Sequence, residues 1–236
     1  MNGSIYLACA ASCVVAYLLC GFPTALVLGR ALGKVDVRTV GSGNVGSTNV
    51  ARSVGTSAGV ATLLLDVLKA AVSMLVGYLL IGFVATGEGF AEVVPGAPYD
   101  WTMALVYLAC ILGHVFSPYL HFKGGKGIAV GFGGALVLMP LAGVSLLVPF
   151  LLFAVSTRYV SLGSIAAAIS LPFLSAAIYR PSAAFMVIVT IVAALVVWAH
   201  RSNIVKLVHG RESKFSFKSK KGAPKHNDVA PAKAGE

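Results

Sequence analysis

The sequence GSGNVGSTNVAR, residues 41–52, is a polar stretch that separates two long apolar runs. Its three glycines free the backbone for positive φ and for close approach to a ligand, so that consecutive N–H groups can turn toward one anion. Arg52 ends the stretch with a permanent charge and a planar set of N–H groups suited to phosphate or carboxylate. Further donors come from Ser42, Asn44, Ser47, Thr48 and Asn49. The stretch predicts an anion-binding loop at a membrane surface.

The apolar runs on either side place the chain in a membrane. The run Ile5–Leu28 carries no charge, and at about 1.5 Å per residue it is long enough to cross ~30 Å of hydrocarbon. Of the 236 residues, 58% are hydrophobic and 11% charged, with a mean hydropathy of +0.88. This composition excludes an ordinary soluble domain. The four cysteines lie inside apolar runs without metal-ligand spacing, so no metal site is expected.

The remaining hydrophobic pattern predicts an all-α integral membrane protein with seven spans. After Ile5–Leu28 the spans are Ser57–Val84, Thr102–Phe116, two short spans within Ile128–Ala154, Leu162–Tyr179 and Ala183–Ala199. Ile128–Ala154 is either one kinked helix or a short hairpin that turns near Met139–Pro140, because proline interrupts helices. The hairpin, as spans four and five, is favoured because it keeps the long basic segments on one side of the membrane.

The charge distribution predicts the orientation of these spans. Residues 30–55 contain four Lys or Arg residues, and residues 200–236 contain nine of the 18 in the chain. Residues 85–101 contain three acidic residues but no Lys or Arg. Because Lys and Arg stay on the cytoplasmic side, the N-terminus is expected outside and the C-terminus in the cytoplasm. Residues 1–210 form the predicted membrane domain. Residues 211–236 form a basic tail that is expected to be disordered and to attract anionic lipid head groups.

A second polar stretch, FKGGKG at residues 122–127, places two ammonium groups on a glycine turn. Such a turn suits phosphate or charge that develops on an oxygen. It lacks the spacing of a nucleotide-binding P-loop, so ATP binding is not predicted. Four polar segments are expected to meet at one cytoplasmic opening: the first loop, this second stretch, residues 158–161 and residues 200–203. Their convergence favours a binding site over separate solvated loops.

Two charged or polar pairs have two interpretations each. Asp66 and Lys69 are three residues apart within a predicted span, and they form either a structural ion pair or part of the site. His200 and Asn203 share a helix face if the last span continues by one turn. His200 then accepts a proton or binds phosphate while Asn203 orients it, or the two are an ordinary interfacial pair.

Three stretches together resemble the bacterial acyl-phosphate:glycerol-3-phosphate acyltransferases. Residues 37–52 are similar to the first motif of that family. Residues 113–116 with 122–127 are similar to its second motif, and residues 200–204 through 210–212 to its third. The order of the motifs is kept over nearly the whole chain.

The resemblance implies transfer of a fatty acyl group from acyl phosphate to the 1-hydroxyl of sn-glycerol 3-phosphate, giving lysophosphatidic acid and phosphate. It implies as catalytic residues Ser42, Arg52, Lys126, His200 and Asn203. It implies as substrate-binding residues Gly41, Gly43, Asn44, Ser47, Thr48, Asn49, Lys123, Gly124, Gly125, Gly127 and Ser161. In this hypothesis Ser42, Arg52 and Lys126 clamp phosphate oxygens. A substrate phosphate, or alternatively His200, takes the hydroxyl proton.

The resemblance also implies the setting of the reaction. It places the chain in the bacterial inner membrane with its active site facing the cytoplasm. The implied partners are acyl phosphate, glycerol 3-phosphate and membrane lipids, with no cofactor, no nucleic acid and no obligate protein partner. A transporter for an anionic phosphorylated solute is the main alternative, because phosphate-sized sites between short, proline-interrupted spans also suit alternating access. A non-catalytic scaffold is a second alternative, but it leaves the glycine-rich loops unexplained.

Overall fold

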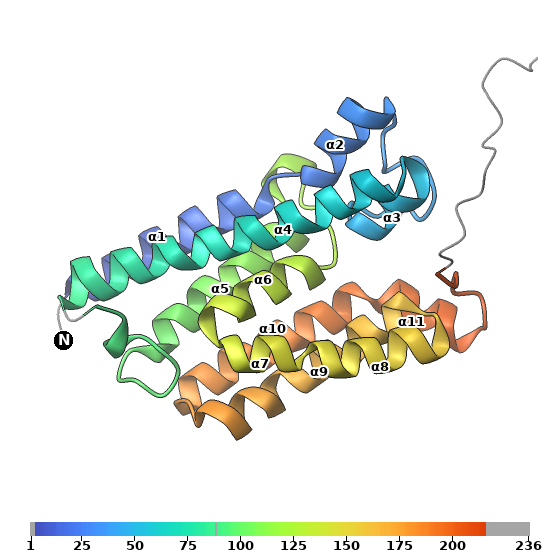
Figure 1. Ribbon diagram of the computed structural model, residues 1–236. Helices are drawn as coiled ribbons and strands as arrows, with labels where there is room; N and C mark the ends of the chain where they lie inside the picture. Colours follow the sequence, from blue (N-terminus) through green and yellow to red (C-terminus); the bar gives the residue numbers. More distant parts are fainter. Residues whose placement is uncertain (1–2, 88, 216–236) are drawn as a thin grey trace, which may run out of the picture.

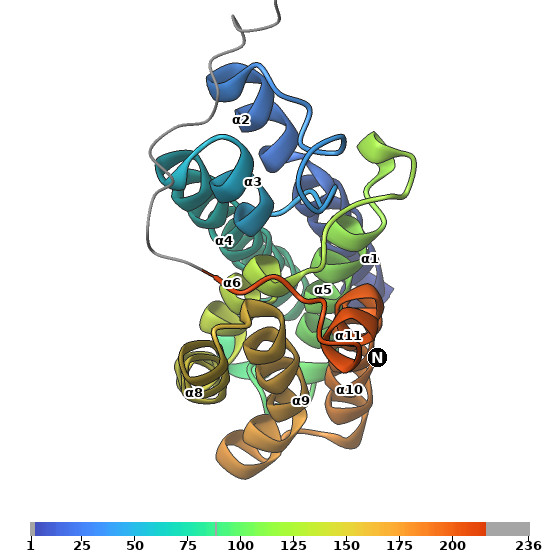
Figure 2. The same ribbon diagram turned by 90° about the vertical axis from the view of Figure 1, so that its right-hand side faces the viewer.

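The computed structural model describes residues 3–87 and 89–215, and these residues form helices and loops without any β-strand. Figures 1 and 2 show the long helices side by side in one bundle, with α1 beginning at one end and α11 lying at the other. The expectation of an all-α architecture is confirmed for this part of the chain. Most of the predicted tail, residues 216–236, lies outside it.

The first apolar run is divided into two helices. Helix α1 covers Gly3–Gly21 and α2 covers Thr24–Gly33, with Pro23 immediately before α2. Proline lacks a backbone N–H and disfavours the helical conformation of the residue before it, so the chain turns at Phe22 and Pro23. The single helix expected over this run is therefore interrupted near its C-terminal end.

The second run follows the first polar loop and is helical throughout. Helix α3 covers Ser47–Ser53, α4 covers Thr56–Gly77, and a π-helical continuation, η1, covers Tyr78–Thr86. A short 3-10 turn, η2, covers Gly89–Glu92. The α4–η1 unit agrees with the span predicted over Ser57–Val84.

The middle of the chain contains the predicted break at Pro140. Helix α5 covers Asp100–Val115, η3 covers Pro118–Leu120, α6 covers Ile128–Leu138, α7 covers Pro140–Ser145 and α8 covers Leu147–Thr157. The chain therefore breaks at Met139 rather than forming one continuous helix. Helix α6 has 11 residues, or about 16 Å at 1.5 Å per residue, which is short for a complete crossing.

The last three helices carry the chain back to the polar end of the bundle. Helix α9 covers Val160–Tyr179, α10 covers Ala183–Ala199 and α11 covers Arg201–Val208. The axes of α10 and α11 differ by 54° across His200. The last span therefore bends at this histidine instead of continuing straight.

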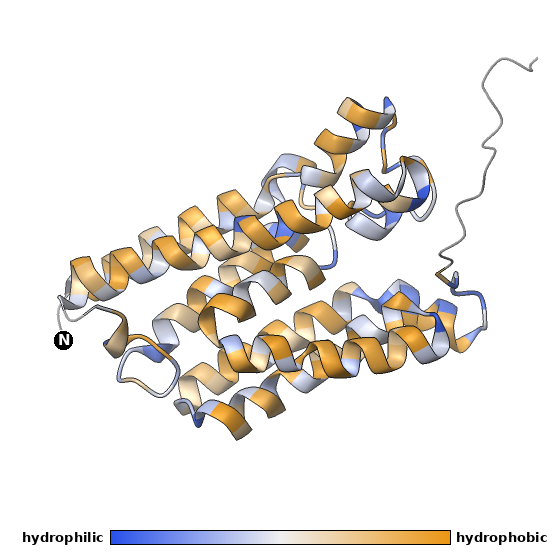
Figure 3. Cartoon of the chain, viewed as in Figure 1, coloured by the Kyte–Doolittle hydropathy of each residue, from blue (hydrophilic) through white to orange (hydrophobic). Residues whose placement is uncertain are grey.

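Five helical segments among the described residues are long and apolar enough to cross a membrane, and α10 with α11 makes a sixth. In Figure 1 consecutive spans alternate in direction only when the shorter α6 is included, because α5 and α7–α8 run the same way along the bundle and α6 runs back between them. Outward-facing side chains are apolar, as with Leu64, Val148 and Phe173, which are 62%, 68% and 71% exposed. Figure 3 shows hydrophilic residues gathered mainly in the loops at the two ends. An exposed apolar belt of this extent is typical of lipid contact.

Glycines let the central helices approach closely. A Cβ added to Gly113 of α5 would lie 2.2 Å from the carbonyl oxygen of Tyr17 in α1, and one added to Gly133 of α6 would lie 2.3 Å from that of Val67 in α4. In lipid there is no hydrophobic driving force between helices, so their association depends on close van der Waals packing, which small residues at the contacts allow. These contacts bring α5, which leads into the second polar loop, against α1, and α6, which leads out of that loop, against α4.

Candidate active site

A polar cavity of about 470 Å³ lies at the end of the bundle seen in Figure 2, where three of the predicted polar segments meet. The first loop contributes Arg38, Ser42, Gly43, Asn44 and Val45. The second loop contributes Phe122, Lys123, Gly124, Gly125 and Lys126, together with Val115 and Phe116. The α10–α11 junction contributes Trp198, Ala199, Arg201, Ser202, Asn203 and Lys206.

The first loop is held in shape by Asn49. Its side-chain oxygen accepts the Ser42 N–H at 2.9 Å, and its amide nitrogen donates to the carbonyls of Val37 and Val40 at 2.7 and 3.2 Å. Gly41 has φ +59°, and a Cβ there would lie 2.3 Å from Asn49 Oδ1. Asn49 and Gly41 therefore shape the loop from behind, while Ser42 faces the cavity.

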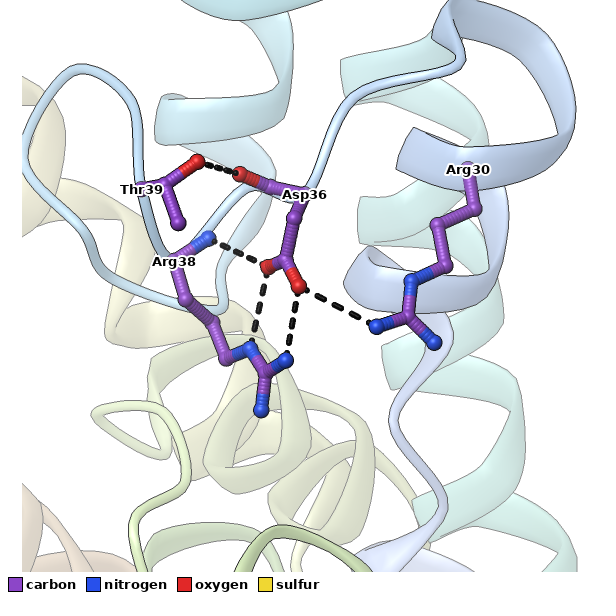
Figure 4. A network of polar contacts seen from close by, with 4 residues as sticks. All are labelled: Arg30, Asp36, Arg38 and Thr39. Carbon is purple, nitrogen blue, oxygen red and sulfur yellow. Dashed lines mark hydrogen bonds and ion pairs between the residues drawn. The ribbon is translucent and has the colours of Figure 1, made fainter.

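A carboxylate orients Arg38 at the cavity wall (Figure 4). Asp36 Oδ1 accepts the Arg38 Nε–H at 2.9 Å, and Oδ2 accepts Nη2 of Arg38 at 2.6 Å and Nη2 of Arg30 at 3.1 Å. The hydrogen bonds from the Arg38 side chain are the main reason that the pKa of Asp36 lies well below its usual range. Arg38 was absent from the predicted site residues. It lies in the first family-like motif, but the sequence does not show which way it points.

Most loop N–H groups at the cavity donate within the protein rather than toward a ligand. Gly43 donates to the Val40 carbonyl, Gly124 to that of Val115 and Gly125 to that of His114, all at 3.0 Å. These donations differ from the predicted nest of free N–H groups. The glycines act sterically instead, since a Cβ at Gly124 would lie 2.0 Å from the His114 carbonyl oxygen. Cationic side chains therefore supply much of the attraction for an anion.

Lys126 is the half-buried cation of the cavity lining, whereas Arg38 and the other lining Lys and Arg residues are exposed. Its ammonium donates to Asn203 Oδ1. Asn203 Nδ2 donates to Glu212 Oε1 at 2.9 Å, and the Ser161 hydroxyl donates to the same oxygen at 3.0 Å. Burial lowers the pKa of Lys126 from 10.5 to about 8, with Lys206 and Arg52 lowering it further and Glu212 opposing them. A charge held in this way is ready to bind an anion without reorganising.

Glu212 is the main site residue that the sequence reasoning missed. It follows the predicted domain boundary at residue 210, although it lies within the third family-like motif. Residues 212–215 return to the bundle, where the Phe215 N–H donates to the Arg158 carbonyl at 2.8 Å. Arg52 Nη2 donates to the Ser213 carbonyl at 3.4 Å, so Arg52 lies beside this returning segment.

The other predicted residues fall around the cavity rather than in its wall. His200 is 3% exposed, and its Nδ1 lies 2.8 Å from the Val196 carbonyl. In the neutral ring this contact makes Nδ1 the donor and leaves Nε2 as an acceptor. Ser47 and Thr48 form the first turn of α3. The sequence patterns also gave no role to Trp198 and Arg201, which stack at 4.0 Å in a cation–π contact at the cavity wall.

An apolar pocket of about 200 Å³ begins next to the polar cavity. It lies between α6, α8, α9 and α10, and its walls include Gly127, Gly131, Phe150, Ala168, Leu171 and Val196. Lys126 lines the polar cavity and Gly127 the apolar pocket. Neighbouring residues thus join a site for charge to a site for hydrocarbon.

No group of three or more histidine, cysteine, aspartate or glutamate side chains is placed to hold a metal ion within residues 3–87 and 89–215. The four cysteines are free thiols in the helical bundle. The chemistry that these residues offer is charge stabilisation and positioning.

Comparison with known proteins identifies the family. A family model described as glycerol-3-phosphate acyltransferase matches residues 10–210. The glycerol-3-phosphate acyltransferase of Geobacter sulfurreducens is 44% identical over 202 residues, which cover 85% of this chain and 94% of the relative. That of Trichlorobacter lovleyi is 43% identical over 201 residues, with the same coverage of 85% and 94%.

Two solved structures have the same fold. Both are crystal structures of PlsY (YgiH), an integral membrane glycerol 3-phosphate acyltransferase. The glycerol 3-phosphate form is 33% identical, with a TM-score of 0.75 over 88% of this chain and 96% of that chain. The lysophosphatidic acid form is 32% identical, with a TM-score of 0.73 over 88% and 95%. This chain belongs to the family of integral membrane glycerol-3-phosphate acyltransferases.

Proposed function

We propose that this protein transfers a fatty acyl group from acyl phosphate to the 1-hydroxyl of sn-glycerol 3-phosphate, giving lysophosphatidic acid and phosphate. The observation that carries the proposal is the junction between Lys126, which lines the polar cavity, and Gly127, which lines the apolar pocket. The product has a phosphate head and a hydrocarbon chain, so it requires two such sites side by side. The glycerol 3-phosphate and lysophosphatidic acid forms of PlsY support this reading.

The reaction needs positioning more than a strong base. The substrate hydroxyl oxygen forms a bond to the acyl carbon, and the bond from that carbon to the phosphate oxygen breaks. The hydroxyl proton goes to the departing phosphate or to His200. Because a mixed anhydride has a good leaving group, cations that stabilise the developing oxyanion and the phosphate account for much of the catalysis. Arg38 and Lys126 line the cavity, and Arg52 is close enough to Lys126 to lower its pKa. We assign to Arg52 and Lys126 the phosphate clamp.

The apolar pocket takes the acyl chain in this proposal. Its lining is almost entirely carbon, and it runs from Gly127 at the polar end to Leu146 and Leu171 within the bundle. Burial of each methylene in such a pocket contributes about 0.8 kcal/mol. Ala167, Ala168 and Gly131 leave the width that a chain needs, since larger side chains there would fill the pocket.

We also propose the seven-span topology with the N-terminus outside, the C-terminus in the cytoplasm and the cavity facing the cytoplasm of a bacterial inner membrane. The distribution of Lys and Arg supports this orientation. It requires α6, though short, to count as a span in a hairpin with α7 and α8. The membrane domain in this proposal extends past residue 210 to include Glu212.

The pH dependence of the reaction should follow Lys126. Its ammonium binds phosphate when protonated, and its pKa is about 8 in the free protein. Since kcat/KM reports groups of the free enzyme, kcat/KM for glycerol 3-phosphate should be level below pH 8. It should then fall toward tenfold per pH unit above that value. The measurement is a series of initial rates from pH 7 to 10 with purified enzyme. In Lys126→Arg the guanidinium stays charged, so this decline should disappear, whereas an unchanged profile would contradict the assignment.

One assay separates the proposal from its alternatives. Purified protein in detergent, given palmitoyl phosphate and glycerol 3-phosphate, should form lysophosphatidic acid and phosphate in equal amounts. A transporter of phosphorylated solutes gives no product in detergent but moves glycerol 3-phosphate across sealed vesicles. A scaffold does neither, so the absence of product in the detergent assay refutes the proposal.

A further inference from the structure

An ion pair is buried behind the polar cavity. Asp66 and Lys69 lie on α4, with Lys69 Nζ 2.8 Å from Asp66 Oδ1, and their side chains are 3% and 10% exposed. The Thr24 hydroxyl donates to the same aspartate oxygen at 2.5 Å. Burying two charges is costly, and apolar side chains of similar size often stabilise a protein equally well. Stability alone is therefore a poor explanation for this pair.

Lys69 connects the pair to two other parts of the chain. Its ammonium donates to the Phe22 carbonyl at 2.9 Å and lies 3.3 Å from His114 Nδ1. Phe22 lies at the break between α1 and α2, which leads into the first loop. His114 lies near the end of α5, which leads into the second loop. An ammonium can only donate, so Nδ1 of His114 accepts and the imidazole proton is on Nε2.

His114 in turn lies directly against the second loop. Its carbonyl accepts the Gly125 N–H at 3.0 Å. A Cβ added to Gly125 would lie 2.2 Å from His114 Nε2 and 3.0 Å from the Val45 carbonyl oxygen in the first loop. Gly125 is thus enclosed between the imidazole and the first loop, one residue before Lys126. A rotation of the ring would displace the segment that carries Lys126.

We propose that Asp66, Lys69 and His114 form a positioning network that fixes the Lys126 loop against the first loop for binding of glycerol 3-phosphate. Asp66 holds Lys69, Lys69 fixes the ring orientation of His114, and His114 fixes the backbone at Gly125. The three residues act through Lys126 and do not touch the substrate. This inference rests on the proposed function for the identity of the substrate.

The His114 variants form a matched pair. Asparagine keeps an acceptor near the position of Nδ1, whereas leucine removes it. His114→Leu is expected to raise KM for glycerol 3-phosphate about tenfold, with kcat and KM for palmitoyl phosphate changed less than about twofold. His114→Asn is expected to restore KM to within about threefold of wild type. A purely structural role would lower activity toward both substrates together with the folded yield.

A double variant tests the charges of Asp66 and Lys69 by removing both together, so that neither is left buried without its partner. The variant D66N/K69M removes both and is expected to raise KM for glycerol 3-phosphate about tenfold. Adding His114→Leu to it should change KM by less than about twofold, because residues that act through one contact are not additive. Ser73→Ala is the control, since Ser73 bonds to the Lys69 carbonyl at 2.7 Å but not to the loop, and it should leave both KM values unchanged.

A readout independent of activity separates this inference from the proposed function. Acetylation of Lys126 by acetic anhydride, followed by mass spectrometry, should become severalfold faster in His114→Leu and return toward the wild-type rate in His114→Asn. Equal acetylation in all three proteins, or equal KM values in the two His114 variants, overturns the positioning network. Lack of acyl transfer by the wild-type protein overturns the proposed function instead, and the acetylation rates still test the network.

Discussion

Replacing Lys126 by methionine is expected to lower kcat/KM for glycerol 3-phosphate about hundredfold. The ammonium is fixed by Asn203 and held at the cavity beside Arg38 and Lys206. A hydrogen bond to a charged group contributes about 1.5–3 kcal/mol, and about 1.4 kcal/mol corresponds to tenfold in rate. The fold should survive, because Glu212 keeps its hydrogen bonds from Asn203 and Ser161. The measurement is initial-rate kinetics together with the yield of monodisperse protein in detergent.

Lys34→Met is the matched control for this variant. Lys34 is exposed at the end of α2 and lies outside the cavity lining, so its loss should leave kcat/KM within about twofold. A Lys126→Met protein that is folded and retains kcat/KM within about threefold of wild type would contradict the phosphate clamp.

Filling the apolar pocket should change the preferred acyl chain length. In Ala168→Phe the ring enters the pocket that we assign to the chain and excludes about four methylene groups. At about 0.8 kcal/mol each, this exclusion costs about 3 kcal/mol. The ratio of kcat/KM for palmitoyl phosphate to that for decanoyl phosphate should therefore fall about hundredfold. Competition between the two donors, resolved by mass spectrometry of the products, measures this ratio directly.

Ile169→Phe supplies the control on the same helix. Ile169 is 50% exposed on the outer face of α9, whereas Ala168 is 6% exposed, so the substitution at 169 adds the same ring toward lipid. In Ile169→Phe the ratio of kcat/KM for palmitoyl phosphate to that for decanoyl phosphate should match the wild-type ratio. If Ala168→Phe slows both donors equally, the acyl chain lies elsewhere.

The sequence predicted the helices better than their interruptions. Long apolar runs without charge can only be helices in a bilayer, because every backbone group must find a partner inside the segment. Pro140 correctly marked a break, since proline removes a donor in mid-run. Pro23 also indicates a break, but the uncharged apolar run around it favoured one continuous helix, so the turn between α1 and α2 was not predicted. The bend at His200 has no proline or glycine to mark it.

The candidate site was predicted in outline and missed in its connections. Glycine and lysine in two loops pointed to segments that contribute to the cavity lining, whereas residues 158–161, which were expected at the same opening, do not line it. The contact from Glu212 to Ser161 joins residues 51 positions apart, and only the folded chain brings them together. The role of glycine N–H groups was also misjudged, because whether they face a ligand or a neighbouring carbonyl depends on the packing of α5. The apolar pocket arises where small side chains meet on different helices, which no periodicity reveals.

The order of Lys126 and Gly127 along the chain has a consequence for how the product leaves. In the proposed reaction and topology, lysophosphatidic acid made at this junction has its head group at the aqueous boundary and its tail directed toward the middle of the bilayer. Phospholipids in one leaflet of a bilayer have the same orientation. The product can therefore leave by lateral diffusion into the surrounding lipid without reorienting. It needs neither a carrier protein nor passage through water.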